Sequence, residues 1–80
     1  MAEVTVLFFA YAADRMSARK KQYEVRDGIT VAEFFEQELA GPLNEPVGAL
    51  LFSVNEEWAD KSRVLVDGDA LAVIPPVSGG

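Results

Sequence analysis

The sequence predicts an α+β fold in which one amphipathic helix packs against a mixed β-sheet. Half of the 80 residues are apolar and a quarter are charged, which is typical of a single folded domain. Short β-branched and aromatic segments recur along the chain, whereas only residues 30–42 show a long helical apolar period. One helix combined with several strands indicates a layered α+β arrangement.

The first half of the chain contains two predicted strands. Residues 3–10, EVTVLFFA, are β-branched and aromatic, as a buried strand should be. Residues 11–20 are weakly helical or loop, and residues 21–28 alternate again before an Asp27-Gly28 turn. Alternation in the first strand gives two faces: Val4, Val6 and Phe8 on one, and Thr5, Leu7 and Phe9 on the other.

Residues 30–42 form the predicted main helix. Thr30 and Glu33 have the spacing of a capping box, and Gly41-Pro42 is a stop signal. The apolar residues that recur at helical spacing form one stripe: Val31, Phe34, Phe35 and Leu39.

The second half of the chain predicts three more strands. They are residues 49–55, a short strand at 64–66 and a last strand at 70–74, with an exposed polar excursion at 56–63. The last strand must end at Pro75-Pro76, since proline cannot donate a ladder hydrogen bond. The resulting order fits a β-grasp roll at residues 1–76 followed by an extended tail at 77–80. Other small α+β folds fit the same pattern.

Composition limits what this chain does by itself. It has no cysteine and no histidine, so it lacks thiolate sites and the commonest general base and metal ligand. We expect no bound metal, and a reducing cytoplasmic location fits. The net charge of −6 argues against nucleic acid. The charge favours either a basic protein partner or solubility alone. The apolar start is too short to predict a membrane segment.

The polar residues do not form a recognisable catalytic pattern either. Asp67 and Asp69 bracket a glycine, as in a tight turn, and lack the ligand pattern of a calcium loop. Glu56-Glu57 is more typical of a solvated loop than of an acid/base pair. The serines have no neighbouring histidine to activate them.

The end of the sequence, PPVSGG, is the exception. The two prolines hold the backbone extended, and glycines at both final positions leave no side chain to block a narrow channel. The reactive group that this arrangement presents is the α-carboxylate of Gly80. Once activated by a leaving group such as AMP, this carboxylate becomes an electrophile that a sulfur nucleophile converts to a thiocarboxylate. The tail therefore predicts a carrier whose chemistry is completed by partner proteins.

Several motifs together resemble the small subunit of molybdopterin synthase, a family of ubiquitin-like sulfur carriers. They are VLFFA at 6–10, VN at 54–55 before an exposed loop, DGD at 67–69 before the last strand, and PPVSGG at 75–80. The resemblance covers essentially the whole chain in the expected order.

This resemblance implies a β-grasp fold and a defined set of partners. An E1-like (ubiquitin-activating-enzyme-like) adenylyltransferase would use ATP to form a transient acyl-adenylate on Gly80, and a sulfur donor protein would lead to the thiocarboxylate. No permanently bound cofactor is implied. Val77, Ser78 and Gly79 would enter a pocket of the large subunit, within a heterotetramer. There, sulfur would pass to cyclic pyranopterin monophosphate to form the molybdopterin dithiolene.

The resemblance also implies an apolar docking patch at Phe9, Trp58 and Ile74. Strand alternation supports Phe9 and Ile74, because both fall opposite the core-facing residues of their strands. Trp58 is a large aromatic residue in a polar stretch. In this family the residue before the prolines is often aromatic, so Ile74 changes the shape of the patch but not its apolar character.

Three alternatives remain open on the sequence. The first is a related carrier for thiamin synthesis, cysteine synthesis or tRNA thiolation. The second is a ubiquitin-like modifier conjugated through Gly80, and the third is an interaction domain with an idle tail. The prolines and the chain length favour the molybdopterin synthase carrier over these.

Overall fold

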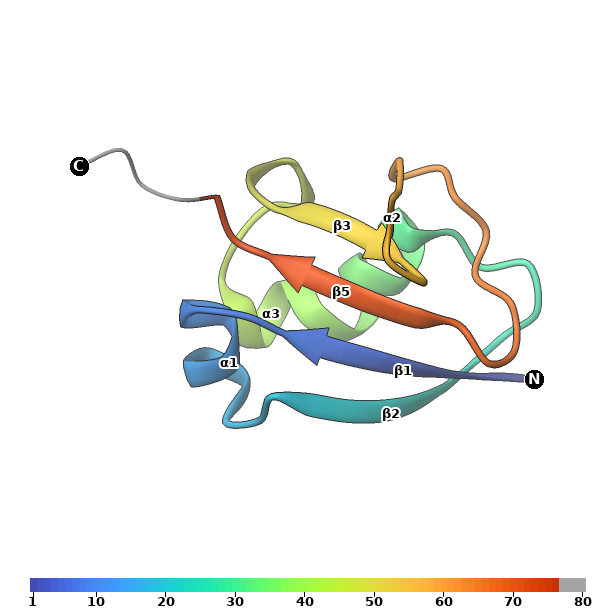
Figure 1. Cartoon of the computed structure of the whole chain (residues 1–80), viewed down its shortest axis with the longest axis horizontal. Coiled ribbons are helices and arrows are strands. Elements are labelled where there is room, and N and C mark those ends of the chain that lie inside the picture. The colour runs from blue at the N-terminus through green and yellow to red at the C-terminus, as the bar shows by residue number, and fades with distance from the viewer. Residues whose placement is uncertain (77–80) are drawn as a thin grey trace.

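The computed structural model describes residues 1–76 and contains one five-stranded sheet with helices on one face (Figure 1). The strands run in the spatial order β2-β1-β5-β3-β4. Their bounds are β1 Ala2–Phe8, β2 Lys20–Val25, β3 Leu51–Val54, β4 Glu57–Trp58 and β5 Ala70–Ile74. Residues 77–80, the predicted tail, lie outside the described residues.

The sheet is mixed, because its two central strands are parallel and the others are antiparallel to their neighbours. β1 and β5 pair in parallel, from Thr5–Ala70 to Phe8–Val73. β2 pairs antiparallel with β1, while β3 pairs antiparallel with β5 and with the two-residue strand β4. A helix that crosses one face of such a sheet is a β-grasp arrangement, as the sequence predicted.

The main helix begins where the sequence predicts. The Thr30 hydroxyl accepts from the Glu33 amide at 3.1 Å, and the Glu33 carboxylate accepts from the Thr30 amide at 3.0 Å, which completes the capping box. The Thr30 amide is the main cause of a lowered Glu33 pKa. Arg26 also lowers that pKa through an ion pair of 2.9 Å.

The predicted stop at Gly41-Pro42 is wrong. The helix runs as α2 Val31–Phe34, a π-helical segment η1 Phe35–Leu39, and α3 Ala40–Leu43. Pro42 lies in the first turn of α3, where the missing amide hydrogen costs no intrahelical bond. The helix ends instead at Asn44, which adopts φ 54° and donates its amide to the carbonyls of Ala40 and Gly41.

The short strand of the second half is also placed differently from the prediction. Residues 64–66 contain only an isolated bridge between Val64 and Thr30, because this segment covers the start of α2 rather than extending the sheet. Strand β4 lies instead within the predicted excursion at 56–63. Residues 11–20 include a helix, α1 Tyr11–Met16, and a short 3₁₀ turn, η2 Val47–Ala49, precedes β3.

The hydrophobic core lies between the sheet and the helices. The predicted helical stripe is fully buried, and so is the predicted inner face of β1. Phe35 packs edge-on against Phe52 of β3, with ring centroids 5.8 Å apart. The residues of these two buried sets are Val4, Val6, Phe8, Val31, Phe34, Phe35 and Leu39. Core formation on one side leaves the other face of the sheet uncovered by helices (Figure 1).

A buried carboxylate holds together the turns that connect β3, β4 and β5. Asp69 accepts from the Asn55 side-chain amide and from the Val66 backbone amide, both at 2.9 Å. The Asn55 carbonyl oxygen in turn accepts from the Ala70 amide at 2.9 Å. Asp69 is the buried charged residue of the described chain, and these donors compensate its burial.

Replacing Asp69 with alanine should destabilise the fold by about 2 kcal/mol, because two partly buried N–H donors lose a charged acceptor. Urea denaturation followed by circular dichroism measures the change. Asp67→Ala is the matched control, since its carboxylate accepts only the exposed Glu3 amide. We expect a loss of about 1 kcal/mol or less there. Equal losses in both variants would contradict a structural role for the buried network.

Candidate functional site

Two of the predicted docking residues lie together at one end of the open sheet face. The last paired residues of the central strands are Phe8 and Val73, and the Phe9 amide donates to the Val73 carbonyl at 3.3 Å. Phe9 and Ile74 follow this pair, so their side chains leave the sheet on the face opposite the core. Phe9 is 48% exposed and Ile74 is half-buried. Alternation alone predicted this placement correctly.

Leu51 belongs to the same surface and was missed by the sequence analysis. It pairs with Ile74 across β3 and β5 and is 50% exposed. Leu7 and Ala72, which pair across β1 and β5, continue the apolar area along the strands. Alternation in residues 49–55 places Leu51 on the face opposite the buried Phe52. The sequence pattern could therefore have predicted that Leu51 lies on the open face. We call these five residues the sheet patch: Leu7, Phe9, Leu51, Ala72 and Ile74.

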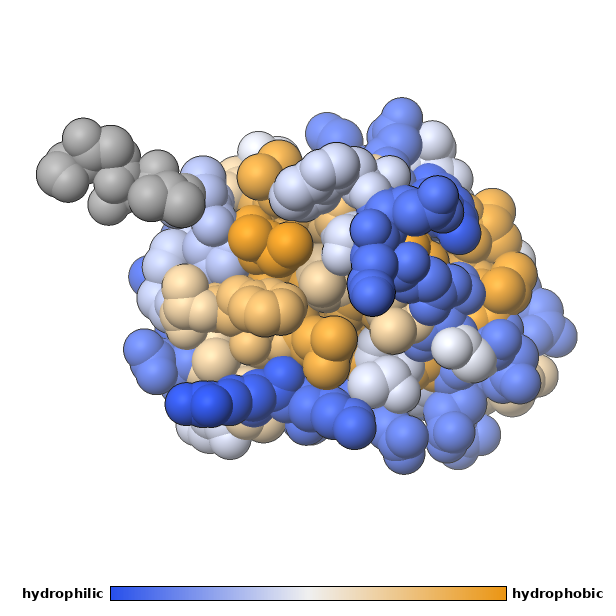
Figure 2. Space-filling model, in the orientation of Figure 1, coloured by the Kyte–Doolittle hydropathy of each residue, from blue (hydrophilic) through white to orange (hydrophobic). Residues whose placement is uncertain are grey.

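The space-filling view shows apolar side chains gathered over the ends of β1, β5 and β3, while hydrophilic residues cover most of the remaining face (Figure 2). An apolar area that is contiguous and rimmed by polar residues is typical of an interaction surface. The patch lies where the described chain ends, next to Pro75 and Pro76.

Trp58 lies at the margin of the same face. It pairs with Ser53 across β3 and β4, and its side chain is 71% exposed. The hairpin that carries it turns through Asn55 and Glu56, both with positive φ, at 52° and 71°. This is the backbone of a tight two-residue hairpin turn. The structure therefore brings Trp58 onto the face of the sheet patch, and its docking role stays a prediction.

The position of Phe9 is fixed by the turn and helix that follow it. Ala10 adopts φ 51° and ψ −134°, a strained conformation for a residue with a side chain, and leads directly into α1. Arg15 of α1 donates to the Leu43 carbonyl at 2.7 Å and to the Glu45 carboxylate at 3.1 Å. These bonds hold α1 against the end of α3 and so hold the chain after Phe9, while pairing of Phe8 with Val73 holds the chain before it.

The base of the tail is anchored in the described part of the chain. Sheet pairing ends at Ile74, Pro75 is buried, and Pro76 is exposed. The predicted reactive residues Val77, Ser78, Gly79 and Gly80 lie outside the described residues, so their roles remain predictions.

The residues with shifted pKa values in the described part of the chain lie away from the sheet patch. Within residues 1–76, no group of three or more acidic, histidine or cysteine side chains is placed to hold a metal ion. Burial raises the pKa of Tyr23, and Glu38 adds to the effect, but Tyr23 packs on the core side of the sheet against Phe34. Glu33, with its lowered pKa, caps the helix. These shifts belong to the fold rather than to the sheet patch.

Comparison with known proteins identifies the family. The family model described as ThiS family matches residues 6–80, which is nearly the whole chain. The chain belongs to the ThiS family. This match extends through the final glycines as well as the folded body.

Relatives and solved structures agree with this assignment. The human protein named molybdopterin synthase sulfur carrier subunit is 33% identical over 85 residues, with 100% of this chain and 97% of that protein covered. SAMP1 from Haloferax volcanii is 26% identical with a TM-score of 0.81, over 99% of this chain and all of that one. A chain in the complex of subunits 1 and 2 of molybdopterin-converting factor from Helicobacter pylori is 27% identical. Its TM-score is 0.67, with 98% of this chain and 99% of that one covered.

The structure also bears on the predicted relation to membranes. Among residues 1–76 of this ThiS-family chain, none of the helices combines the length and the apolar character needed to cross a lipid bilayer.

Trp58 provides a direct test of the open face, since it is the single tryptophan of the chain. Because its side chain is 71% exposed, we expect its fluorescence to resemble that of tryptophan in water and to be quenched readily by acrylamide. Unfolding in urea should remove the far-ultraviolet circular dichroism with little shift of the emission maximum. A large shift to longer wavelength on unfolding would show that Trp58 is shielded in the folded chain.

Proposed function

We propose that this chain is the sulfur carrier subunit of a molybdopterin synthase. The observation that carries the proposal is the end-to-end similarity to relatives of that name, 29% identical in Chlamydomonas reinhardtii and 33% in human, with the family match reaching Gly80. The chain supplies a terminal carboxylate and a recognition surface, and partner proteins supply the catalytic groups. We infer that it works in the cytoplasm.

In the proposed reaction, the Gly80 carboxylate attacks the α-phosphorus of ATP on an E1-like adenylyltransferase. Pyrophosphate leaves and an acyl-adenylate forms. Sulfur at the oxidation level of sulfide, delivered by a donor protein, displaces AMP and leaves a thiocarboxylate. The thiocarboxylate sulfur then passes to cyclic pyranopterin monophosphate, and water restores the carboxylate. Two such transfers build the dithiolene of molybdopterin.

The position of the sheet patch supports delivery of the tail into a partner. Because β1 and β5 are parallel, their final residues reach the same end of the sheet, and the chain continues from there through Pro75 and Pro76. A large synthase subunit that covers Phe9, Leu51 and Ile74 is therefore next to the start of the tail. The similarity to a chain in the Helicobacter pylori complex of subunits 1 and 2 favours this kind of partner. We infer the heterotetramer on the same grounds.

A second candidate function is protein modification through Gly80. The similarity to SAMP1, a small archaeal modifier protein, favours it, because that structure aligns over 99% of this chain with a TM-score of 0.81. In this case the activated carboxylate would acylate a lysine amine instead of accepting sulfur. Carriers for thiamin, cysteine or tRNA thiolation remain a variant of the first proposal with another acceptor.

Removing Gly80 should abolish thiocarboxylate formation while leaving the fold intact, because sheet pairing ends at Ile74. We expect a stability change within about 0.5 kcal/mol, because the last strand ends at Ile74, well before Gly80. The assay is intact mass after incubation with the adenylyltransferase, ATP and a sulfur donor. The wild-type chain should gain the mass difference between sulfur and oxygen, and the truncated chain should not.

The same reaction separates the two candidate functions. A thiocarboxylated chain that forms molybdopterin from cyclic pyranopterin monophosphate with the large subunit supports the carrier. Isopeptide-linked products at lysines, with no sulfur transferred to the pterin, would instead support the modifier. Loss of the folded circular dichroism spectrum on removal of Gly80 would show that the end of the chain is structural.

The docking surface is tested by placing a charge in it. Phe9→Glu and Ile74→Glu should each weaken binding to the large subunit by about 2 kcal/mol or more, as expected for the centre of an interface. Isothermal titration calorimetry measures the affinities. Val66→Glu is the matched control, because Val66 is 56% exposed and lies on the loop before β5, away from the patch. Wild-type affinity in the two patch variants would refute this docking mode.

A further inference from the structure

We propose that Arg19 and Lys20 form a basic margin of the docking face, which pairs with carboxylates of the large subunit and orients it on the sheet patch. The inference rests on the proposed function, because it takes the large subunit as the partner. It adds a charged margin to the surface predicted from Phe9, Trp58 and Ile74.

The position of Lys20 follows from the register of the sheet. Lys20 pairs with Leu7, Leu7 with Ala72, Ala72 with Ser53, and Ser53 with Trp58. This single row crosses all five strands on the open face and places Lys20 and Trp58 at opposite margins. The sheet patch lies between them.

Arg19 and Lys20 also contact the same hollow as Phe9. The two basic residues, together with Phe9, Ala10 and Asp14, line a concavity of about 590 Å³ at the end of β1. Both basic side chains are exposed. A strongly hydrophilic strip borders the apolar area along β2 in Figure 2. A partner that covers Phe9 therefore comes close to these two charges.

This basic margin contrasts with the rest of an acidic chain. The protein has 13 acidic and 7 basic residues. Within residues 1–76, Arg15 pairs with Glu45 and Arg26 pairs with Glu33. The basic residues without an ion pair in that range are Arg19, Lys20, Lys21, Lys61 and Arg63. Of these, Arg19 and Lys20 line the hollow beside Phe9, so their charges are available to a partner there.

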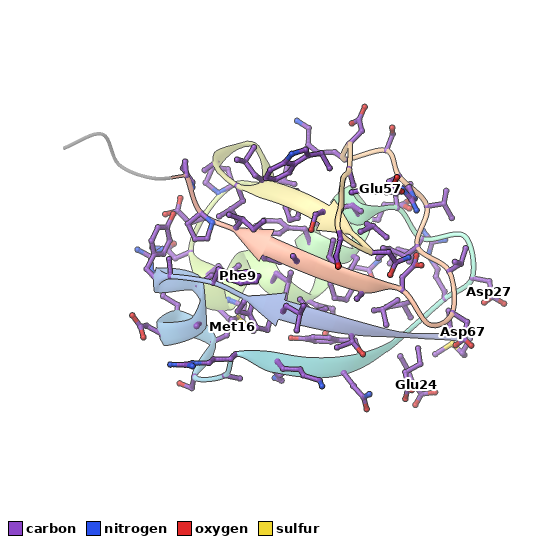
Figure 3. The ribbon with its side chains drawn as sticks, viewed as in Figure 1. Phe9, Met16, Glu24, Asp27, Glu57 and Asp67 are labelled. Atoms are coloured by element: carbon purple, nitrogen blue, oxygen red, sulfur yellow. The ribbon has the colours of Figure 1, made fainter. Side chains whose placement is uncertain are left out.

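The far end of the sheet carries the opposite charge, whereas the charges beside Trp58 are mixed. Lys61 lines the same hollow as Trp58, the hairpin turn carries Glu56, and Glu57 pairs with the core-facing Val54. At the end of the sheet farthest from Phe9, Figure 3 shows the acidic residues Glu24, Asp27 and Asp67. The docking face is therefore positive at the Phe9 end of β2, at Arg19 and Lys20, and negative at the opposite end, where Glu24 of the same strand lies on the same face.

Opposite charges at two margins give a direction that an apolar patch alone lacks. Hydrophobic burial is non-directional, so it stabilises several orientations of a partner on the same patch. A large subunit with carboxylates opposite Arg19 and Lys20 gains from one orientation, and in the reversed orientation those carboxylates meet Glu24 and are repelled. The correct orientation also brings its catalytic pocket to the side from which the chain continues after Pro76. Attraction between exposed charges acts mainly on the association rate.

The test compares association rates of Lys20→Glu and Arg63→Glu with that of the wild-type chain, using stopped-flow mixing with the large subunit. Both variants change the net charge equally, but Arg63 lies in the loop that contacts the start of α2. At low ionic strength we expect Lys20→Glu to associate about 10-fold more slowly and Arg63→Glu to stay within about 2-fold. The difference should disappear near 1 M salt, where screening is strong.

Equal slowing by the two variants would overturn the inference, because it would show that only net charge matters. An unchanged rate for Lys20→Glu would also overturn it, and would leave Lys20 the ordinary role of discouraging contact between exposed strand edges. Lys20→Gln should give an intermediate rate if the charge acts locally. Circular dichroism checks that each variant is folded.

The inference and the proposed function fail in different ways. A wild-type chain that does not bind the large subunit contradicts both. Normal binding and sulfur transfer by the wild type, with no selective effect at Lys20, leaves the proposed function standing and removes only the basic margin.

Discussion

The parallel pairing of β1 with β5 is the contact on which the rest of the structure depends. It joins the two ends of the sequence in the centre of the sheet and makes both strands finish at the same end. Phe9 and the start of the tail are neighbours for this reason alone. The pairing is held by burial of Val6, Phe8 and Val73 against the helix. Hydrophobic packing on one face therefore fixes the geometry of the interaction surface on the other.

The proposed function separates recognition, on the open face of the sheet, from reactivity at Gly80. Its helices cover one face of the sheet, and the open face keeps large apolar side chains exposed at the end where the chain continues into Pro75 and Pro76. A small domain gains by burying such residues, so their exposure in a contiguous area needs an explanation. A partner surface supplies one. The acidic residues at the far end of the sheet and the basic residues Arg19 and Lys20 beside Phe9 restrict which partner surfaces fit, because opposite charges favour one orientation.

The sequence predicted local structure correctly where a residue type has a single physical effect. The capping box at Thr30 and Glu33, the buried stripe with Phe34 and Phe35, and the strand break before Pro75 all appear as predicted. The prediction of a helix end at Pro42 was wrong, because the effect of proline depends on its position within a helix. A π-helical segment ends just before α3, so Pro42 falls in a first turn and is tolerated. Residues 64–66 have strand composition but pair with the helix start at Thr30.

The sequence by itself determined the fold class and the faces of the strands, and it alone carries the prediction that the carboxylate of Gly80 is the reactive group. These follow from side-chain periodicity and from which chemical groups are present or missing. Only the tertiary structure decided that Leu51 joins Phe9 and Ile74, that Trp58 shares their face, and that Lys20 lies at the opposite margin. Each of these depends on strand order and register between distant segments. Pairing energy from many contacts sets that register, and no single stretch of sequence encodes it.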